Sequence, residues 1–167
     1  MNGGCSNCWP TIEDALDKLN TPLPPLHYRR AGEADIGAMS RIRLAVSENR
    51  LSDPGRITHA MYVDYLDRLG RSWVCEADGV VAGFAAVDAA DGSIWALFVD
   101  PAHEGRGIGK QLLALAADYL FTQGYASIAL ATAADTRADV FYAAQGWERG
   151  KMKNDIEVRY TLCRPAR

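Results

Sequence analysis

Apolar positions from residue 27 onward follow the period-2 and period-3.6 spacings of strands and helices, and they predict a continuous series of elements. Strands are predicted over 27–30, 72–77, 80–88, 94–99, 127–132, 147–153 and 157–162. Helices are predicted over 33–48, 58–69, 107–122 and 135–144. The order is βααβββαβαββ, which predicts an α/β (α+β) fold. Its single mixed, mostly antiparallel and twisted sheet would carry helices on both faces.

Turn and stop signals separate these elements. The dipeptide Asp78-Gly79 suits a two-residue hairpin, because both central residues of such a turn need a positive φ. Pro101 lacks a backbone donor and therefore ends the strand before it. Gly146 is placed to end the last helix, and the side chain of Asp135 is predicted to cap the start of that helix.

Residues 1–26 differ from the rest and are predicted to form an N-terminal extension. A short amphipathic helix is expected over 11–20, followed by a stiff proline-rich linker over 21–26. Cys5 and Cys8 have the spacing of half a zinc site, but no second ligand pair accompanies them. No metal site is therefore predicted, and a disordered tail is the favoured alternative.

The composition limits the class of protein. The chain has 167 residues, of which 49% are hydrophobic, so one domain with its own core is expected and intrinsic disorder is excluded. Eighteen basic and 21 acidic residues, a net charge of −3, argue against a nucleic-acid partner. No apolar run approaches the roughly 18 residues of a membrane span, and no signal peptide is recognisable. A cytoplasmic protein with reduced cysteines and no membrane partner is expected.

The segment from Leu97 to Leu113 combines a strand, a glycine-rich loop and the start of a helix. The first turn of a helix has amide groups without internal partners, and the helix dipole adds positive potential there. Glycines at positions 105, 107 and 109 keep side chains away from those amides, while Arg106 and Lys110 add fixed positive charge. The segment therefore predicts a cradle for phosphate, and a pyrophosphate is a suitable ligand.

Spacing excludes two other phosphate-binding motifs. A P-loop requires glycine and then Ser or Thr at positions where this chain has Glu104 and Gln111. A dinucleotide-binding fingerprint requires glycine where the chain has Lys110 and Leu112. The remaining alternative is that the glycines form only a tight turn before a helix.

Two motifs resemble those of the GNAT acetyltransferase superfamily. Residues 99–109, Val-Asp-Pro-Ala-His-Glu-Gly-Arg-Gly-Ile-Gly, are similar to the acetyl-CoA motif of that family. Residues 138–147, Ala-Asp-Val-Phe-Tyr-Ala-Ala-Gln-Gly-Trp, resemble its second motif. The element order is similar as well, so the resemblance implies an N-acetyltransferase domain over 27–163, with acetyl-CoA as co-substrate and no metal.

The resemblance also implies roles for individual residues. The splayed end of one strand would bind the pantetheine arm, and the glycine loop would bind the pyrophosphate. The cofactor-binding residues implied are Leu97, Phe98, Val99, Gly105, Arg106, Gly107, Ile108, Gly109 and Lys110. A strand amide near Val99 would hold the thioester carbonyl. Tyr142 matches the family's tyrosine near the CoA sulfur, where a phenol protonated at neutral pH acts as general acid. The alternative for Tyr142 is a packed core aromatic.

Three residues depart from the family pattern. Glu104 replaces Gln or Arg, so its carboxylate must point away from the pyrophosphate or take no part in binding. Asp135 stands where relatives often have Asn in contact with the cofactor. Leu130 occupies the position of a glutamate base found in some relatives that acetylate protein N-termini, which argues against that base and that substrate class.

An amine acceptor must lose a proton before it attacks, and three residues are candidate bases: Glu48, Glu76 and His103. Structural roles are favoured for all three, and a water chain is the alternative, so no base is assigned.

The predicted function is direct transfer of acetyl from acetyl-CoA to a primary amine of a small molecule. A protein acetyltransferase and a non-catalytic acyl-CoA sensor are the alternatives, and a homodimer is considered. Arg41, Arg43 and Arg50 lie on or after the first helix, where an anionic acceptor group would find them. The favoured reading for these arginines is a solvated helix face.

Overall fold

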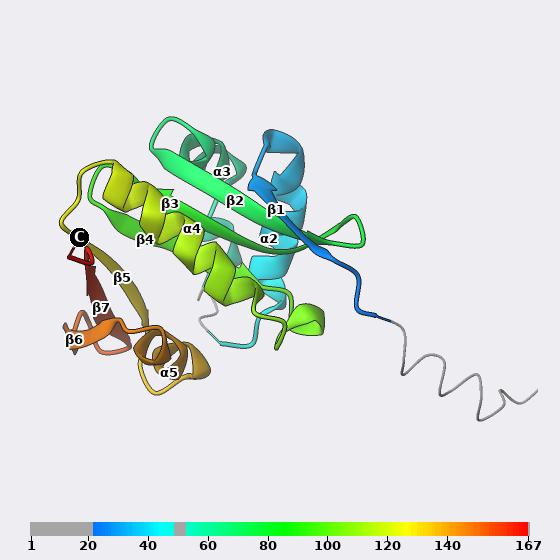
Figure 1. Cartoon of the computed structure of the whole chain (residues 1–167). Coiled ribbons are helices and arrows are strands. Elements are labelled where there is room, and N and C mark those ends of the chain that lie inside the picture. The colour runs from blue at the N-terminus through cyan, green and yellow to red at the C-terminus, as the bar shows by residue number, and fades with distance from the viewer. Residues whose placement is uncertain (1–21, 49–52, 167) are drawn as a thin grey trace, which may run out of the picture.

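The computed structural model describes residues 22–48 and 53–166, which form a seven-stranded sheet in the order β1-β2-β3-β4-β5-β7-β6 (Figure 1). The strands are β1 (Leu26–Arg30), β2 (Gly70–Ala77), β3 (Val80–Asp88), β4 (Ser93–Val99), β5 (Ser127–Ala133), β6 (Glu148–Met152) and β7 (Glu157–Cys163). The helices are α2 (Ile36–Ala45), α3 (His59–Leu66), α4 (Ile108–Thr122) and α5 (Arg137–Ala144), with short 3-10 turns η1 (Glu33–Asp35), η2 (Pro54–Arg56) and η3 (Pro101–His103). All strand pairs are antiparallel except β4 with β5.

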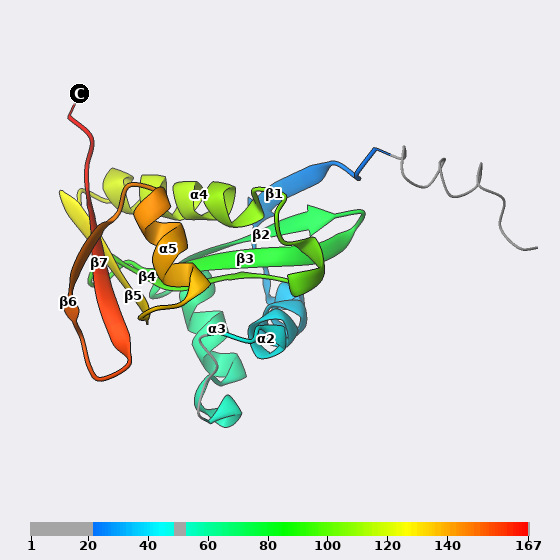
Figure 2. The same ribbon diagram turned by 90° about the horizontal axis from the view of Figure 1, so that it is seen from below.

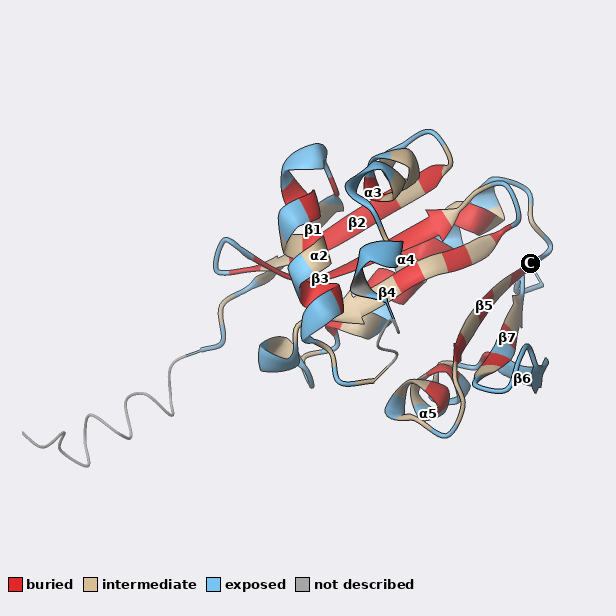
Figure 3. Ribbon diagram, turned by 180° about the vertical axis from the view of Figure 1, so that it is seen from behind, coloured by how far each residue is buried: buried red, intermediate tan, exposed pale blue. Residues whose placement is uncertain are grey.

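Helices cover both faces of the sheet. Helix α4 crosses one face, and α2 and α3 pack on the opposite face (Figure 2). The buried side of α4 is a continuous stripe, and its members are Ile108, Leu112, Leu113, Ala116, Ala117 and Leu120. Helix α5 packs against β5, and its Tyr142 joins the same hydrophobic cluster as α4. The central strand β3 is consequently buried along nearly its whole length (Figure 3).

The structure confirms the predicted order of elements and the mixed sheet with helices on both faces. Two helices are shorter than predicted. The α2 segment starts as the 3-10 turn η1 and its helix ends at Ala45, because Val46 adopts an extended backbone with ψ of 144°. Helix α3 ends at Leu66, because the chain turns into β2 at Gly70.

The predicted cap of α5 is wrong by one residue. Thr136 is the N-cap, and its hydroxyl accepts a hydrogen bond from the backbone amide of Asp139. Asp135 precedes the cap in a left-handed conformation with φ of 60°. The predicted helix over 11–20, the cysteine pair Cys5 and Cys8, and Arg50 all lie outside the described residues. Among the described residues, none of the helices has both the length and the apolar character needed to cross a bilayer.

Gly83 on β3 allows α4 to lie close to the sheet. A Cβ atom at this position would lie 2.9 Å from Cγ2 of Ile108 and 3.1 Å from the carbonyl oxygen of Phe98. Ile108 is the first residue of α4, and Phe98 is near the end of β4. The missing side chain therefore sets how near the start of α4 comes to the end of β4.

We expect Gly83→Val to destabilise the protein by about 1–3 kcal/mol, the usual cost of forcing extra volume into a packed core. The matched control is Gly37→Ala on the exposed side of α2, where an added Cβ meets nothing within 4 Å. That control should keep or slightly raise stability, because alanine is the better helix former. Thermal unfolding measures both variants, and equal melting temperatures for Gly83→Val and the wild type would contradict the close packing.

Candidate functional site

The site is built where β4 and β5 separate. These two parallel strands share one ladder pair, Ser93 with Ala129, supported by a hydrogen bond of 3.1 Å from the Ala129 amide to the Gly92 carbonyl. Beyond that pair the strands diverge toward their carboxyl ends (Figures 1 and 3). The last residues of β4 pair with β3 on one side only, so the other edge of their backbone faces the gap.

A β-bulge in β4 determines which side chains face which side of the sheet. Ala86 pairs with Ala96 and Val87 with Ile94, which leaves Trp95 as the extra residue. Trp95 and Ala96 therefore both belong to the cluster beneath α2 and α3, whereas Leu97 returns to the α4 side. Bulges redirect side chains in this way next to binding sites. The sequence pattern of 94–99 predicted a regular strand and did not indicate the bulge.

The glycine loop leads directly into α4. Gly105 has φ of 75° and Gly107, the N-cap of α4, has φ of 78°, so both adopt the left-handed conformation that favours glycine. An added Cβ at either position would meet nothing within 4 Å. Gly109 has a different role, because a Cβ there would lie 3.5 Å from Val99 and 3.6 Å from Phe141. The loop thus presents an open helix N-terminus against the end of β4.

A cavity of about 500 Å³ extends from this N-terminus along the end of β4. Eight of the nine residues predicted to bind the cofactor line it: Leu97, Phe98, Val99, Gly105, Gly107, Ile108, Gly109 and Lys110. Ile108 is buried in the core, so its amide rather than its side chain is available to a ligand. Arg106 lies outside the lining, and its guanidinium donates to the carbonyl of Pro24 at 2.6 Å. We name this the cofactor cavity.

A second cavity of about 550 Å³ lies between β4, β5 and the start of β7, and we name it the acceptor cavity after the role that is proposed for it below. Its lining includes Arg43 and Arg56 from the α2 and η2 segments, and Asp155 and Glu157 from the hairpin between β6 and β7. Three residues line both cavities, namely Leu97, Phe98 and Tyr142. The two cavities therefore meet at these residues, at the open end of β4.

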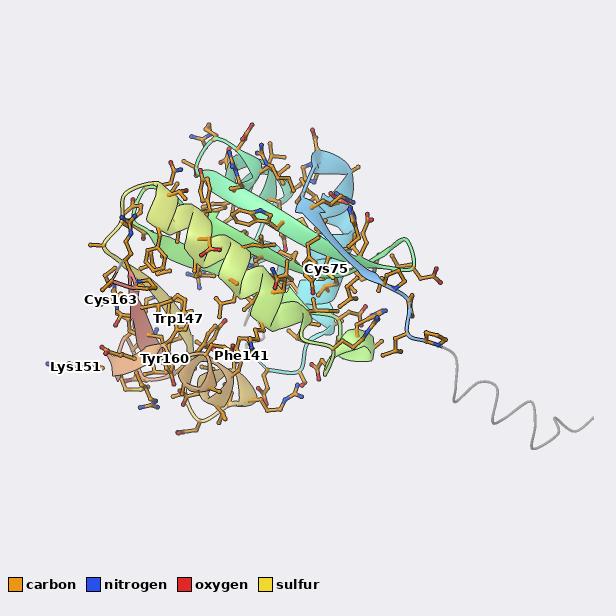
Figure 4. The ribbon with its side chains drawn as sticks, viewed as in Figure 1. Cys75, Phe141, Trp147, Lys151, Tyr160 and Cys163 are labelled. Carbon is orange, nitrogen blue, oxygen red and sulfur yellow. The ribbon has the colours of Figure 1, made fainter. Side chains whose placement is uncertain are left out.

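Tyr142 lies at this junction on α5. The side chain is 7% exposed and packs edge-on against Phe141 and Trp147, with Tyr160 tilted beside it. Figure 4 labels these three neighbouring side chains. Burial raises the pKa of the Tyr142 phenol above its ordinary value, so the hydroxyl is protonated at neutral pH. Tyr142 is thus a packed core aromatic that also lines both cavities, and its phenol is protonated at neutral pH.

A partly buried ionic network fixes the helix that carries Tyr142. The carboxylate of Asp139 accepts from the Arg149 guanidinium on β6, from the Tyr160 hydroxyl on β7 and from the Asp135 amide. The Arg149 guanidinium and the Tyr160 hydroxyl hold the pKa of the Asp139 carboxyl well below its usual range. The network connects α5 to the last two strands. The sequence pattern did not indicate it, since Asp139 lies 10 positions from Arg149 and 21 positions from Tyr160.

The carboxylate of Glu104 is paired with an arginine. Its two carboxylate oxygens accept from the guanidinium of Arg137 at 2.9 and 3.2 Å. Arg137 also contacts Glu48, with 3.5 Å between Nε and a carboxylate oxygen. All three residues line the cofactor cavity, so the positive charge of Arg137 offsets the negative charges of Glu48 and Glu104 at the edge of this cavity. Sequence reasoning had not singled out Arg137.

The candidate bases lie in different places. Glu48 and His103 line the cofactor cavity, and Glu48 is held by Arg137. Glu76 lies on the β1 side of the sheet, where its carboxylate accepts from Arg29 at 3.0 Å, and it lines neither cavity. Leu130 is buried on β5 and lines the acceptor cavity with an apolar side chain.

The arginines on α2 do not share one environment. Arg41 is exposed, as a solvated helix face requires. Arg43 is 7% exposed and lines the acceptor cavity, so the favoured reading of a solvated side chain is wrong for this residue. Its guanidinium packs over aromatic rings of the α2 and α3 side of the sheet.

Comparisons with known proteins place these features in a family. The sequence model of the acetyltransferase (GNAT) family matches residues 38–147, which include the glycine loop and Tyr142. No curated protein is significantly similar to the chain in sequence.

Solved structures share the fold at low sequence identity. The ribosomal-protein-S18-alanine N-acetyltransferase from Escherichia coli is 17% identical, with a TM-score of 0.69 over 83% of this chain and 94% of that one. An N-acetyltransferase from Staphylococcus aureus Mu50 is 19% identical, with a TM-score of 0.67 over 83% and 98%. A Salmonella typhimurium protein, yncA, described as a candidate acetyltransferase and solved with acetyl-CoA, is 18% identical, with a TM-score of 0.67 over 83% and 93%.

The Asp139 network predicts acid sensitivity. Because the pKa of Asp139 is lower in the folded state than in the unfolded chain, its contribution to stability is complete above the unfolded pKa of about 3.9 and declines as pH falls below it. Asp139→Asn should lower the melting temperature at pH 7 by about 4–8 °C, the shift that a loss of about 2 kcal/mol causes in a domain of this size.

The difference between wild type and Asp139→Asn should shrink as pH falls from 5 to about 2. Asp155→Asn, at an exposed position of the last hairpin, is the matched control for a lost carboxylate. Melting curves across this pH range measure the effect, and a difference that is independent of pH would contradict the ionic role of Asp139.

Proposed function

Because the chain belongs to the acetyltransferase (GNAT) family, we propose that it transfers the acetyl group of acetyl-CoA directly to a primary amine of a small molecule. The observation that carries this proposal is the meeting of two cavities at Leu97, Phe98 and Tyr142. Direct transfer needs both substrates bound at once with their reacting atoms in contact. One cavity for each substrate, joined at one point, provides that arrangement.

The cofactor cavity suits a CoA thioester in its chemistry. Amides at the N-terminus of α4 and the Lys110 ammonium would bind the pyrophosphate, since a helix N-terminus favours anions. The unpaired backbone edge of β4 at Leu97–Val99 would hydrogen-bond the amide groups of the pantetheine arm. The pairing of Glu104 with Arg137 supports this proposal, because it reduces repulsion between the carboxylate and the phosphates.

The chemical step forms one bond and breaks one. The neutral amine nitrogen attacks the thioester carbonyl, and the amide N–C bond forms while the C–S bond breaks. A backbone amide near Val99 would stabilise the developing oxyanion, and the Tyr142 hydroxyl would donate its proton to the leaving thiolate. The acceptor nitrogen loses one proton as the amide forms, and this proton returns through solvent to the phenolate. The products are an N-acetylated amine and CoA.

A small acceptor fits the second cavity better than a protein chain does. Its volume of about 550 Å³ lies within the range of small-molecule sites. The E. coli neighbour is named for acetylation of a ribosomal protein, but Leu130 replaces the glutamate base implied for such substrates.

We expect the protein to release free thiol from acetyl-CoA in the presence of at least one amine from a chemically diverse panel. Gly107→Glu should abolish this activity and weaken CoA binding at least about 100-fold, because a carboxylate would occupy the phosphate cradle. Thiol release and calorimetric CoA titration measure the two effects.

Gly124→Glu controls for backbone strain, because Gly124 also has a positive φ, of 102°, and lies at the far end of α4. This control should bind CoA as the wild type does. CoA binding without turnover of any amine would favour the sensor alternative, and unchanged CoA affinity in Gly107→Glu would contradict the assigned phosphate site.

Tyr142→Phe should lower kcat by about 100-fold, which is within the usual contribution of a general acid, and should leave CoA affinity unchanged. Since burial raises the pKa of Tyr142, the wild-type pH–rate profile should show no loss from its ionisation below about pH 10. Tyr119→Phe, on α4 outside both cavities, is the control for a deleted phenol. Full activity of Tyr142→Phe would remove this residue from the acid role.

A further inference from the structure

The guanidinium of Arg43 is buried without a matching anion. The side chain is 7% exposed, and its carbon Cζ lies 4.5 Å from the ring centre of Trp95, 5.0 Å from Phe98 and 5.4 Å from Tyr62. Its Nε and Nη1 atoms are buried and have no hydrogen-bond partner among the residues that the structure describes. Burial lowers the pKa of Arg43, and its charge interaction and hydrogen bond with the Tyr62 side chain partly oppose this shift.

Such an arrangement is unfavourable unless a ligand completes it. Buried charges in folded proteins are paired, and buried donors are nearly always hydrogen-bonded. The aromatic faces around Arg43 attract the cation through their π-electrons, but they accept no conventional in-plane hydrogen bonds. The rings instead hold the planar guanidinium in one orientation. A fixed guanidinium fork with two unpartnered donors, Nε and Nη1, suits an anionic group such as a carboxylate, to which arginine forms charge-assisted hydrogen bonds.

The position of Arg43 relates it to the acceptor cavity. Arg43 lines that cavity and does not line the cofactor cavity. Phe98, against which the guanidinium packs, is one of the three residues that line both. The cation therefore lies next to the junction and not at a distant mouth of the cavity, so an anion bound to it would lie close to the acetyl group.

The other charged residues of the acceptor cavity do not pair with Arg43. Arg56 is a second cation in the lining, whereas Asp155 and Glu157 come from the hairpin between β6 and β7. The Glu157 carboxylate already has partners, because it accepts from the Asn154 side chain at 2.8 Å and contacts Lys153 at 3.5 Å. The buried, unmatched charge that remains in this lining is Arg43, and it is positive.

We propose that Arg43 is a specificity-determining residue that binds a carboxylate of the acceptor, and that the acceptor is an amino acid or a similarly small amine with a carboxylate near its amino group. This inference rests on the proposed function, because it names the substrate class of the same acetyltransferase. The aromatic rings of Trp95 and Phe98 position the guanidinium, and the carboxylate in turn positions the amine at the junction.

The test uses acceptors in matched sets at saturating acetyl-CoA. Each set contains an amino acid, its carboxamide and the amine without the carboxyl group, for glycine, alanine, phenylalanine, glutamate and lysine. We expect the preferred acceptor to be a carboxylate, with kcat/KM at least about 100-fold above that of its carboxamide. The amino group of the carboxamide has the lower pKa, so this preference cannot arise from a larger fraction of neutral amine.

Arg43→Met tests the residue itself, because methionine keeps an apolar side chain among the rings and removes the fork. KM for the preferred carboxylate should rise about 100-fold while CoA affinity stays constant and activity toward the carboxamide does not fall. Arg43→Lys should restore part of the preference, since it retains charge without bidentate geometry. Arg41→Met, on the exposed side of the same helix, is the matched control and should behave as the wild type.

The outcomes separate the two proposals. Acetylation of amines regardless of a carboxylate, or an equal loss toward all acceptors in Arg43→Met, would overturn the role of Arg43 and leave the acetyltransferase intact. Absence of turnover with every amine would overturn both.

A measurement that needs no variant is calorimetric binding of N-acetylglycine, N-acetylphenylalanine and their carboxamides to the wild-type CoA complex, in which only the carboxylates should bind measurably. Equal binding of the two forms would contradict the proposal.

Discussion

The separation of β4 from β5 after a single bridge is the constraint on which the candidate site depends. Continued pairing would use the backbone groups of Leu97–Val99 within the sheet and would close both cavities. Separation leaves one edge of that backbone to be satisfied by solvent or by a ligand, which is a cost that a folded protein must offset. The offset comes from the hydrophobic cluster, which continues from α4 through Trp147 to Val158 and so joins the two halves of the sheet.

The parts of the site that could be predicted from sequence are those encoded by neighbouring residues. Gly105 and Gly107 adopt positive φ, a local property that only their own identity and that of the next few residues determine. The order of strands and helices follows from periodicity in the same way. The exact ends of elements are not encoded locally in this way. At the start of α5, Asp135 and Thr136 are both suitable N-cap residues. Which of them caps the helix depends on Asp139, whose partners lie on β6 and β7.

Charged residues show why the remainder could not be predicted. Arg106 lies within the glycine loop, so proximity in sequence predicted a role beside the phosphates, yet its side chain turns to Pro24, 82 positions away. Arg43 and Arg41 are two residues apart on one helix, and no composition or motif distinguishes them. Only the rings brought together by the tertiary fold, among them Trp95 on its bulge, bury Arg43 and leave Arg41 in solvent.

The two cavities differ in how the chain encodes them, and this difference has a consequence for specificity. Most of the cofactor cavity comes from one continuous segment between Leu97 and Lys110, and in the proposed complex its main contacts with the ligand are backbone groups. The acceptor cavity gathers side chains from α2, η2, β4, β5 and the hairpin before β7. Under the proposed function, a substitution at Arg43 or Leu130 would therefore change which amine is bound without disturbing the thioester. In the proposed enzyme, the family motif fixes the acyl donor, and scattered side chains such as Arg43 select the acceptor.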